Sequence, residues 1–532
     1  MIFGHSNGKI TTSTAVGTDG TYLRSNTVYS DDGSFVTSEE DVNGNTVYYY
    51  YYGNGKLQSA KTVKPSAADT DDTVSHTYVY GENGDLSMEY ISGVVSLAYT
   101  YTKDSISKIL RGGYISGIDT KQEMEYNFTY NPFGRPLAIS IGETPLVTYE
   151  YPAISGEPAY AGNMNPAVIH LANDNLIGYT YDKLDRVILI QYDDVNKASI
   201  RYDRMGNVCR VEDMELGKVY LYEYSDEGVL QYAVVIHADG TQQMMYAEQD
   251  ENDRTTGAFT GIGLDQSVTA TYTYDDSTAI SDKLIGSALT YQNGETVINN
   301  SFAYSYDSLD RLTAKTLSGN GKTLTSAYAY KTIDGNRTSN LLASLTWTSP
   351  EIDTLTFSYT YDLAGNITAA HKNGILIASY TYNVQGQLIY EMLPTQGIEF
   401  LYVYDTYGNI RKAFKVDSET REVLDTQIYT YGDSTWLDKL TAFDGNTITY
   451  DASGNPLTYN NGSAYTFTWD TARNLTSVYH GGVTTSYKYN ADGLRTEKQY
   501  GTTTYKYYYD GDKLPPIVRT AQLRAVYISI LP

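Results

Sequence analysis

The chain has 532 residues, 63 of them acidic and 38 basic, and its formal net charge at pH 7 is −25. This charge argues against nucleic acid and anionic membrane surfaces as partners, because both would repel it. A single cysteine, Cys209, excludes an internal disulfide framework, and no apolar run reaches the roughly 18 residues of a membrane span.

Tyrosine dominates the aromatic composition, with 56 Tyr against 11 Phe and 3 Trp. Many of these tyrosines belong to one unit, Tyr-x-Tyr-Asp-x-x-Gly-Asn/Arg, which is intact at 359–368 and 402–411. Further copies keep its second half or vary it, at 179–187, 201–208, 304–312, 381–388, 449–457, 468–475 and 488–495. A repeat of this kind outranks other sequence signals, because it decides the whole fold.

The repeat has a period of about 20 residues. Tyr361, Tyr382 and Tyr404 are 21 and 22 residues apart, and Tyr450 and Trp469 are 19 apart. At roughly 3.3 Å per residue, about 20 residues supply two strands of six to eight residues and two turns. The drift around one mean indicates hairpins with loops of different length and excludes a coiled-coil heptad.

The unit also predicts its own geometry. In Tyr-x-Tyr the two rings share one face of a strand, and the following Asp opens a turn by accepting backbone hydrogen bonds. Gly365 and Gly408, three residues after their Asp, are expected at positive φ; the same position holds Asp185, Asp310 and Arg473 in other copies. The sequence therefore predicts an all-β chain with very little helix, built as a long antiparallel hairpin ribbon.

In chain order the sequence predicts four regions: degenerate repeats at 1–64, an acidic loop or linker at 65–75, the main repeat region at 76–514 and an atypical tail at 515–532. The tail has no acidic residue and no turn glycine. We expect it to be poorly ordered, or to lie unpaired against the last hairpin. The first residues have neither a basic nor an apolar segment, so no secretion signal is visible.

The copies at 359–368, 402–411, 304–313 and 489–500 resemble the YD repeats of the Rhs (rearrangement hotspot) family. That family includes wall-associated bacterial Rhs proteins, the B–C components of insecticidal toxin complexes and the YD shell of teneurins. The resemblance covers roughly 20–514. It implies a ribbon spiralling into a hollow shell, complete or incomplete, and an extracellular or cell-surface location.

Toxin-bearing members of the family enclose a C-terminal effector and carry a self-cleavage segment with an Asp-Pro motif. This chain has no Asp-Pro pair, so neither the autoprotease nor a toxin is carried over to it. The resemblance therefore implies a possible partner, the enclosed effector, which this chain itself does not contain.

We searched the sequence for chemistry beyond the repeat. The Asp-rich turns offer oxygen ligands for calcium, but turn formation already explains every copy, and EF-hand spacing is absent. The six histidines are dispersed, and Cys209 lies in a strand as a packed thiol. No serine-nucleophile or phosphate-binding motif occurs. The sequence therefore predicts no catalytic, cofactor-binding or metal-binding residue.

The sequence leaves two function hypotheses from different classes. The leading hypothesis is a non-enzymatic structural scaffold that encloses or presents another polypeptide. The alternative is a cell-surface adhesin or carbohydrate-binding protein, with surface glycans as partners, that uses its Tyr-rich faces. Recurrence of the tyrosines in every repeat favours packing between strands over a single sugar site.

Overall fold

The computed structural model describes residues 1–62, 74–91, 95–112, 123–152, 164–263, 265–276, 281–383, 385–405, 407–490, 493–507 and 518–519. Within these residues the one helix is a three-residue 3-10 turn, η3 (Pro394–Gln396), and strands joined by turns make up nearly all the rest. The all-β prediction is confirmed.

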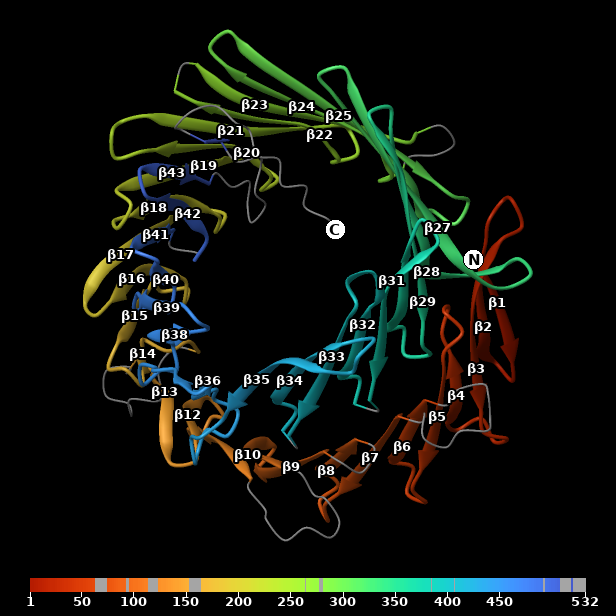
Figure 1. Ribbon diagram of the computed structural model, residues 1–532. Coiled ribbons are helices and arrows are strands. Elements are labelled where there is room, and N and C mark those ends of the chain that lie inside the picture. Colours follow the sequence, from red (N-terminus) through yellow and green to blue (C-terminus); the bar gives the residue numbers. More distant parts are fainter. Residues whose placement is uncertain are drawn as a thin grey trace.

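The strands β1 to β37 form one continuous antiparallel ribbon, since each strand from β1 to β36 pairs with the next along the chain. The ladder breaks once in the described residues, between β37 and β38, and seven strands follow in a second sheet. In Figure 1 the ribbon runs once around a central opening, returns to its own beginning and continues past it. We call the strands up to β25 the first winding, and everything from Asp307 onward the second winding.

The first winding contains β1 Ile2–Ser6, β2 Lys9–Val16, β3 Tyr22–Tyr29, β4 Val36–Glu40, β5 Thr46–Tyr51, β6 Leu57–Thr62, β7 Val74–Tyr80, β8 Leu86–Ile91, β9 Val95–Thr102, β10 Ser105–Gly112, β11 Met124–Tyr130, β12 Pro136–Ile141, β13 Thr144–Glu150, β14 Val168–Leu171, β15 Leu176–Tyr181, β16 Val187–Tyr192, β17 Val195–Tyr202, β18 Val208–Asp213, β19 Lys218–Tyr224, β20 Leu230–Ile236, β21 Gln242–Gln249, β22 Thr255–Ile262, β23 Gln266–Tyr274, β24 Leu284–Asn293 and β25 Thr296–Tyr306.

The second winding contains β26 Leu312–Gly319, β27 Lys322–Asp334, β28 Arg337–Ser349, β29 Ile352–Tyr361, β30 Ile367–Lys372, β31 Ile375–Tyr382, β32 Leu388–Leu393, β33 Ile398–Tyr404, β34 Ile410–Asp417, β35 Val423–Thr430, β36 Ala442–Phe443, β37 Asn446–Thr447, β38 Thr458–Asn460, β39 Ala464–Trp469, β40 Leu475–His480, β41 Val483–Tyr489, β42 Arg495–Tyr500, β43 Thr503–Lys506 and β44 Val518–Arg519.

The Asp of the repeat holds its turn closed from within. Asp362 Oδ1 accepts the backbone N–H groups of Ala364 and Asn366 at 2.9 and 2.8 Å, and its Oδ2 accepts the Asn366 side chain at 3.0 Å. Gly365 takes a φ of +84°, and the ladder has a bulge at Tyr361. The aspartate oxygens are thus engaged in the turn itself, as the turn-forming interpretation predicts. The bond from the Asp Oδ1 to the fifth residue recurs at 182–186, 203–207, 250–254, 307–311, 405–409, 451–455 and 470–474.

Positive φ persists where the glycine is replaced. Asp185 and Asp310 have φ of +63°, and Arg473 has φ of +65°. These residues, which hold the position of the turn glycine, therefore adopt the same backbone conformation as the glycine. The geometry of the repeat therefore survives the loss of its glycine at the cost of some backbone strain.

The second tyrosine of the unit bonds one hairpin to the next. The Tyr382 hydroxyl donates to the carbonyl of Ile367, the first residue of β30, at 3.0 Å. Trp469 replaces this tyrosine in one copy, and its Nε1 donates to Pro456 O at 2.7 Å. The ring packs and the polar tip satisfies a backbone acceptor, which phenylalanine does not provide. The same tyrosine bond occurs at 181, 202, 224, 330, 404 and 489.

Arginine at the end of the unit serves both the turn and the next tyrosine. The Arg186 Nε donates to Asp182 Oδ2 at 2.8 Å, and its guanidinium lies 4.2 Å from the centre of the Tyr202 ring. Arg311 repeats the arrangement, at 4.1 Å over Tyr330. This accounts for Arg and Asn alternating at one position, because both bind the Asp and Arg also covers the ring.

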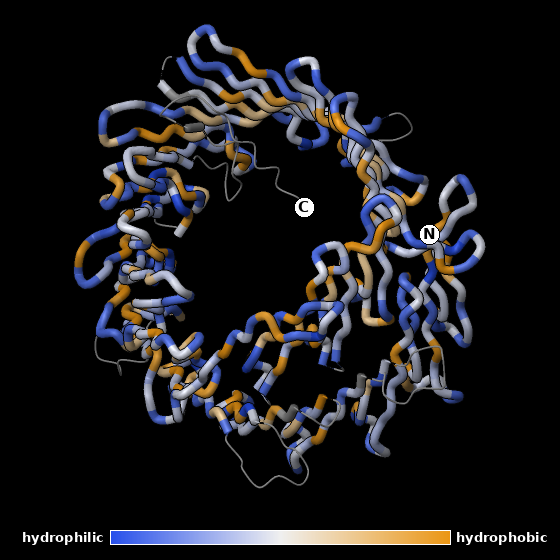
Figure 2. The backbone as a smooth tube through the Cα atoms, viewed as in Figure 1, coloured by the Kyte–Doolittle hydropathy of each residue, from blue (hydrophilic) through white to orange (hydrophobic). Residues whose placement is uncertain are grey.

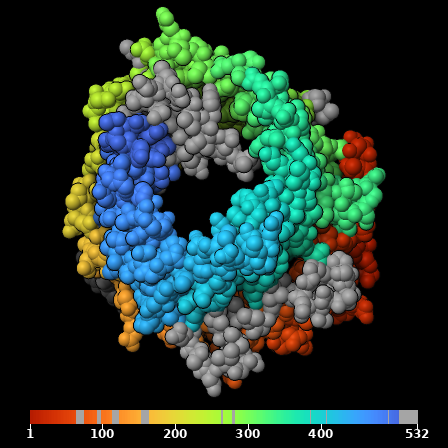
Figure 3. Space-filling model, viewed as in Figure 1, coloured from red at the N-terminus to blue at the C-terminus, as the bar shows by residue number. Residues whose placement is uncertain are grey.

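The wall of the molecule has little conventional core. The largest fully buried side chains among the described residues are Met124, Ile141 and Ser339, and most strand residues are half-buried. Figure 2 shows hydrophobic and hydrophilic segments interleaved around the ring, with no single apolar centre. The space-filling view shows a central opening, with the second winding in front of the first (Figure 3).

The predicted linker and tail fall mostly outside the described residues. Strand β6 pairs with β7, so the ladder is continuous on either side of residues 63–73. In the tail, Val518–Arg519 forms β44 and pairs antiparallel with Tyr505 and Lys506 of β43. Our expectation that the tail lies unpaired is therefore wrong for these two residues. They extend the ladder because strand pairing needs backbone groups and not the Tyr-Asp unit.

Candidate functional site

The ribbon binds to itself where the second winding passes the first, and we call this line of contacts the seam. Hydrogen bonds across it join residues 278 to 313 positions apart. Ser308 Oγ donates to Asp19 Oδ1 at 2.7 Å, and Thr471 Oγ1 donates to Asp193 Oδ2 at 2.7 Å. One passage around the ring therefore uses the 23 strands from β3 to β25, and the seam turns an open ribbon into a closed wall.

Arg337 anchors the start of the seam. It forms a parallel bridge with Tyr22, and its guanidinium donates to Glu40 Oε1 at 2.8 Å and to Arg24 O at 3.0 Å. Burial disfavours ionised Glu40, but hydrogen bonds from Arg337 and Asn26 outweigh it and lower the pKa of this carboxyl. A buried, hydrogen-bonded ion pair of this kind fixes geometry more than it adds stability.

Farther along the seam lies the main buried apolar cluster of the described residues. Met124 of β11 is fully buried against Tyr407 and Leu437 of the second winding, with Tyr126 and Trp436 packed around them. Each apolar side chain of this size contributes about 1.5–3 kcal/mol when it is removed from water. In a molecule with so thin a core, this cluster is a major source of inter-winding stability.

Polar contacts flank the cluster. The Arg111 guanidinium donates to the carbonyl of Tyr407 and lies 3.7 Å from Asp438 Oδ2. The hydroxyl of Tyr126 also points to Asp438, at 3.4 Å. The apolar and charged contacts together join the β10–β11 region to the β33–β34 turn and to the loop that follows β35.

That loop, residues 431–441, is shaped by Asp433. Its Oδ1 accepts the Trp436 backbone N–H at 2.9 Å, and its Oδ2 accepts Lys439 Nζ at 2.7 Å. Burial alone would raise the pKa of Asp433, yet the bond from Lys439 leads to a net lowering. The indole of Trp436 then lies over Gly454, where an added Cβ would come within 2.6 Å of the ring.

A small polar cavity of about 20 Å³ lies between the windings beyond this cluster, lined by residues of β16–β18 and of the turn at 470–474. Burial raises the pKa of Tyr192 to about 12, and the nearby Asp470 carboxylate of the second winding adds to the rise. Asp213 is buried here, and burial raises the pKa of its carboxyl as well. The cavity is too small for more than about one water molecule.

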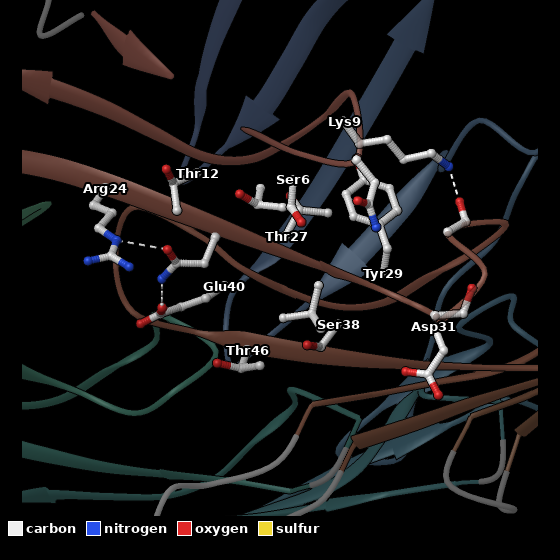
Figure 4. A pocket seen from close by; sticks show the side chains of 16 residues that line it. Ser6, Lys9, Thr12, Arg24, Thr27, Tyr29, Asp31, Ser38, Glu40 and Thr46 are labelled. Carbon is white, nitrogen blue, oxygen red and sulfur yellow. Dashed lines mark hydrogen bonds between the residues drawn. The ribbon is translucent and has the colours of Figure 1, made fainter. Parts of the chain in front are cut away.

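The largest hollow we describe, about 700 Å³, is an open trough across β1–β5. Figure 4 shows Arg24, Glu40, Lys9 and Tyr29 along it. Arg24 donates to the Asn26 side chain at 2.8 Å, which in turn donates to Glu40. Lys9 donates to Gly33 O and lies 4.9 Å from the Tyr29 ring. These charged groups are engaged by neutral side chains and a backbone carbonyl of the trough itself, and their arrangement matches no catalytic set.

The remaining candidate groups also lie apart from one another. Within the described ranges, no three His, Cys, Asp or Glu side chains are arranged to hold a metal ion. Cys209 lies half-buried in β18, with its Sγ 3.5 Å from Arg201 O. No helix in the described part of the chain is long and apolar enough to cross a membrane.

The seam residues are the functional residues that sequence reasoning missed. Ser308, Ser453 and Thr471 occupy the two positions between the Asp and the positive-φ residue, which the repeat leaves variable. Hydroxyl residues at these positions in the second half of the chain are the signal that could have drawn attention to them.

No protein-family model matches the chain. A segment covering 16% of it is 33% identical over 87 residues to the tRNA nuclease WapA of Bacillus subtilis (strain 168), and equally to the tRNA3(Ser)-specific nuclease WapA of Bacillus spizizenii. The match spans 4% of the length of each of these relatives.

The structure is similar to toxin-complex shells. TcdB2-TccC3 without its hypervariable C-terminal region has a TM-score of 0.38 and 13% identity, covering 96% of this chain and 31% of that one. A Tc holotoxin pore of Photorhabdus luminescens has a TM-score of 0.29 and 13% identity, covering 94% and 31%. Both TM-scores are low, so these likenesses carry no argument about what this chain does.

Proposed function

We propose that the chain is a non-enzymatic wall segment of a hollow shell, which encloses or presents a second polypeptide such as a C-terminal effector. One observation carries the proposal: the ribbon passes completely around a central opening and binds to its own beginning along the seam (Figure 3). The side chains that recur in each repeat are engaged within the wall, in its turns and in the tyrosine bonds.

The sequence resemblance to YD-repeat proteins supports the same role and an extracellular or cell-surface location. The division of the chain into residues 1–64, 65–75, 76–514 and 515–532 is also part of this proposal. The nuclease activity named for the Bacillus relatives is not proposed for this chain, because the matched segment is 4% of those proteins.

The glycan-binding alternative has no specific observation in its favour. The second tyrosines of the repeats donate their hydroxyls to backbone carbonyls, as Tyr382 does to Ile367, and these hydroxyls are therefore engaged within the wall. A glycan array remains the direct test of that alternative.

Protease protection tests the enclosing role. An unfolded, epitope-tagged polypeptide is fused either after residue 532 or before Met1, which is exposed at the outer rim of the ring (Figure 1). We expect the C-terminal guest to survive protease that digests the N-terminal guest. Digestion of both guests at the same rate, while the shell itself stays intact, would contradict the proposal.

A further inference from the structure

We infer that the two residues between the Asp and the positive-φ residue of the turn unit determine where the second winding docks on the first. The partner is the first winding of the same chain, and three of the four docking turns meet a hairpin turn there that carries Asp19, Asp193 or Asn173. The inference rests on the shell of the proposed function but not on the guest.

Four turns of the second winding touch the first winding through one of these two residues. Ser308 and Thr471, each directly after its Asp, donate to Asp19 and Asp193. Ser453 accepts the Asn173 backbone N–H at 3.1 Å, and the carbonyl of Tyr407 accepts Arg111. Each of these turns keeps the bond from its Asp Oδ1 to the fifth residue, as in the other copies, so the docking contact is made in addition to the turn's own bond.

The first winding is shaped to receive these residues. At Gly17 an added Cβ would lie 1.9 Å from Ser308 Oγ and 2.8 Å from Ser308 Cβ. The Gly17 φ lies outside the left-handed region, so the backbone does not require glycine. Glycine at this position instead makes room for the serine of the second winding.

Asn173 shows a second complementary contact. In addition to its N–H bond to Ser453, its side-chain amide donates to Asp451 Oδ2 at 3.0 Å. One residue of the first winding thus contacts both the fixed Asp and a variable residue of a single second-winding turn. Ser453 is buried, although it belongs to a hairpin turn that would be exposed to solvent without the first winding beside it.

The turn at 362–365 serves as the internal contrast. Its two variable residues are Leu363 and Ala364, whose side chains have no hydrogen-bonding group, and Ala364 is exposed. The bond from Asp362 Oδ1 to the fifth residue of this turn is the same as in the docking turns. This turn thus forms without docking, and what distinguishes it from the docking turns is the pair of residues at the variable positions.

A complementation experiment tests the inference. Gly17→Ala should push out Ser308 and open the seam. Adding Ser308→Gly should restore closure only in part, because it vacates the same space but also removes the bond to Asp19. Gly53→Ala is the matched control, because no heavy atom lies within 4 Å of the Cβ it would add. Electron microscopy and small-angle scattering of the full chain count closed rings and measure particle dimensions.

We expect Gly17→Ala to lose most closed rings, the double variant to recover part of them, and Gly53→Ala to keep them. Equal ring counts in Gly17→Ala and Gly53→Ala, no recovery in the double variant, or complete recovery without the Ser308 hydroxyl would overturn the inference. Loss of rings with continued protection of a fused C-terminal guest would instead contradict the proposed enclosing function and leave the docking rule intact.

Discussion

The turns at 362–366 and 405–409 have nearly the same local structure and very different surroundings. Asp362 and Asp405 each accept two backbone N–H groups and the side chain of an Asn, and the glycines have φ of +84° and +83°. Yet Ala364 is exposed to solvent, whereas Tyr407 is buried in the seam cluster. The fixed residues of the unit build a turn, and the variable residues decide whether that turn joins two windings.

Alkaline pH should break both kinds of turn at once, because every repeat depends on its tyrosines. Burial raises the pKa of Tyr181, Tyr192 and Tyr402 to about 12. The neutral ring is therefore favoured in the folded state. Its stabilisation is complete below the unfolded value near 10 and is lost as the pH rises toward 12.

We expect unfolding by circular dichroism in this pH window, together with a delayed rise in tyrosinate absorbance. Titration of all tyrosines near pH 10 while the strand signal stays unchanged would show that the rings are not held as described.

A pair of glycine variants separates turn strain from side-chain packing within the second winding. Gly365→Val should cost about 1–3 kcal/mol, because valine resists positive φ and nothing else lies near. Gly454→Val meets the same strain and the Trp436 ring, and should cost about 1–3 kcal/mol more through overpacking. Urea unfolding measures both. Equal losses would mean that Trp436 moves away freely.

The apolar cluster should respond to truncation. Met124→Ala removes a fully buried side chain and should cost about 2–5 kcal/mol. Met205→Ala, at an exposed turn of the first winding, should change the free energy of unfolding by no more than about 0.5 kcal/mol. Equal free energies of unfolding for the two variants would mean that the cluster does not stabilise the contact between the windings.

The smallest effect concerns a single hydroxyl. Tyr382→Phe keeps the ring and removes the bond to Ile367 O, at an expected cost of about 1 kcal/mol. Tyr479→Phe is the matched control, since Tyr479 is half exposed. A difference in unfolding free energy near zero would show that the repeat needs only an aromatic ring at this position.

The local structure could be predicted from the sequence because it is encoded within one repeat. Asp362 and Gly365 lie three residues apart, and their turn follows from side-chain hydrogen bonding and positive φ. The degenerate N-terminal copies were also recognisable, and Gly33, Gly44 and Gly55 all have positive φ. Strand pairing then follows from the short connections.

The seam could not be predicted in the same way. Its contacts join residues almost 300 positions apart, as in the 297-residue separation of Arg337 and Glu40. The curvature that brings them together accumulates from small twists over many strands. The residues themselves, such as Ser308 and Gly17, are common in loops and have no local pattern that distinguishes them.

Cross-linking across the seam tests the central claim most directly. In a straight ribbon, the 23 strands from β3 to β25 that separate Asp19 from Ser308, at roughly 4.8 Å for each strand, amount to about 110 Å. In the closed shell their side chains are 2.7 Å apart. We predict that Asp19→Cys with Ser308→Cys, on a Cys209→Ser background, cross-links rapidly with a short bismaleimide. Cross-linking no faster than in the control pair Gly53→Cys with Ser308→Cys would contradict closure of the ribbon on itself.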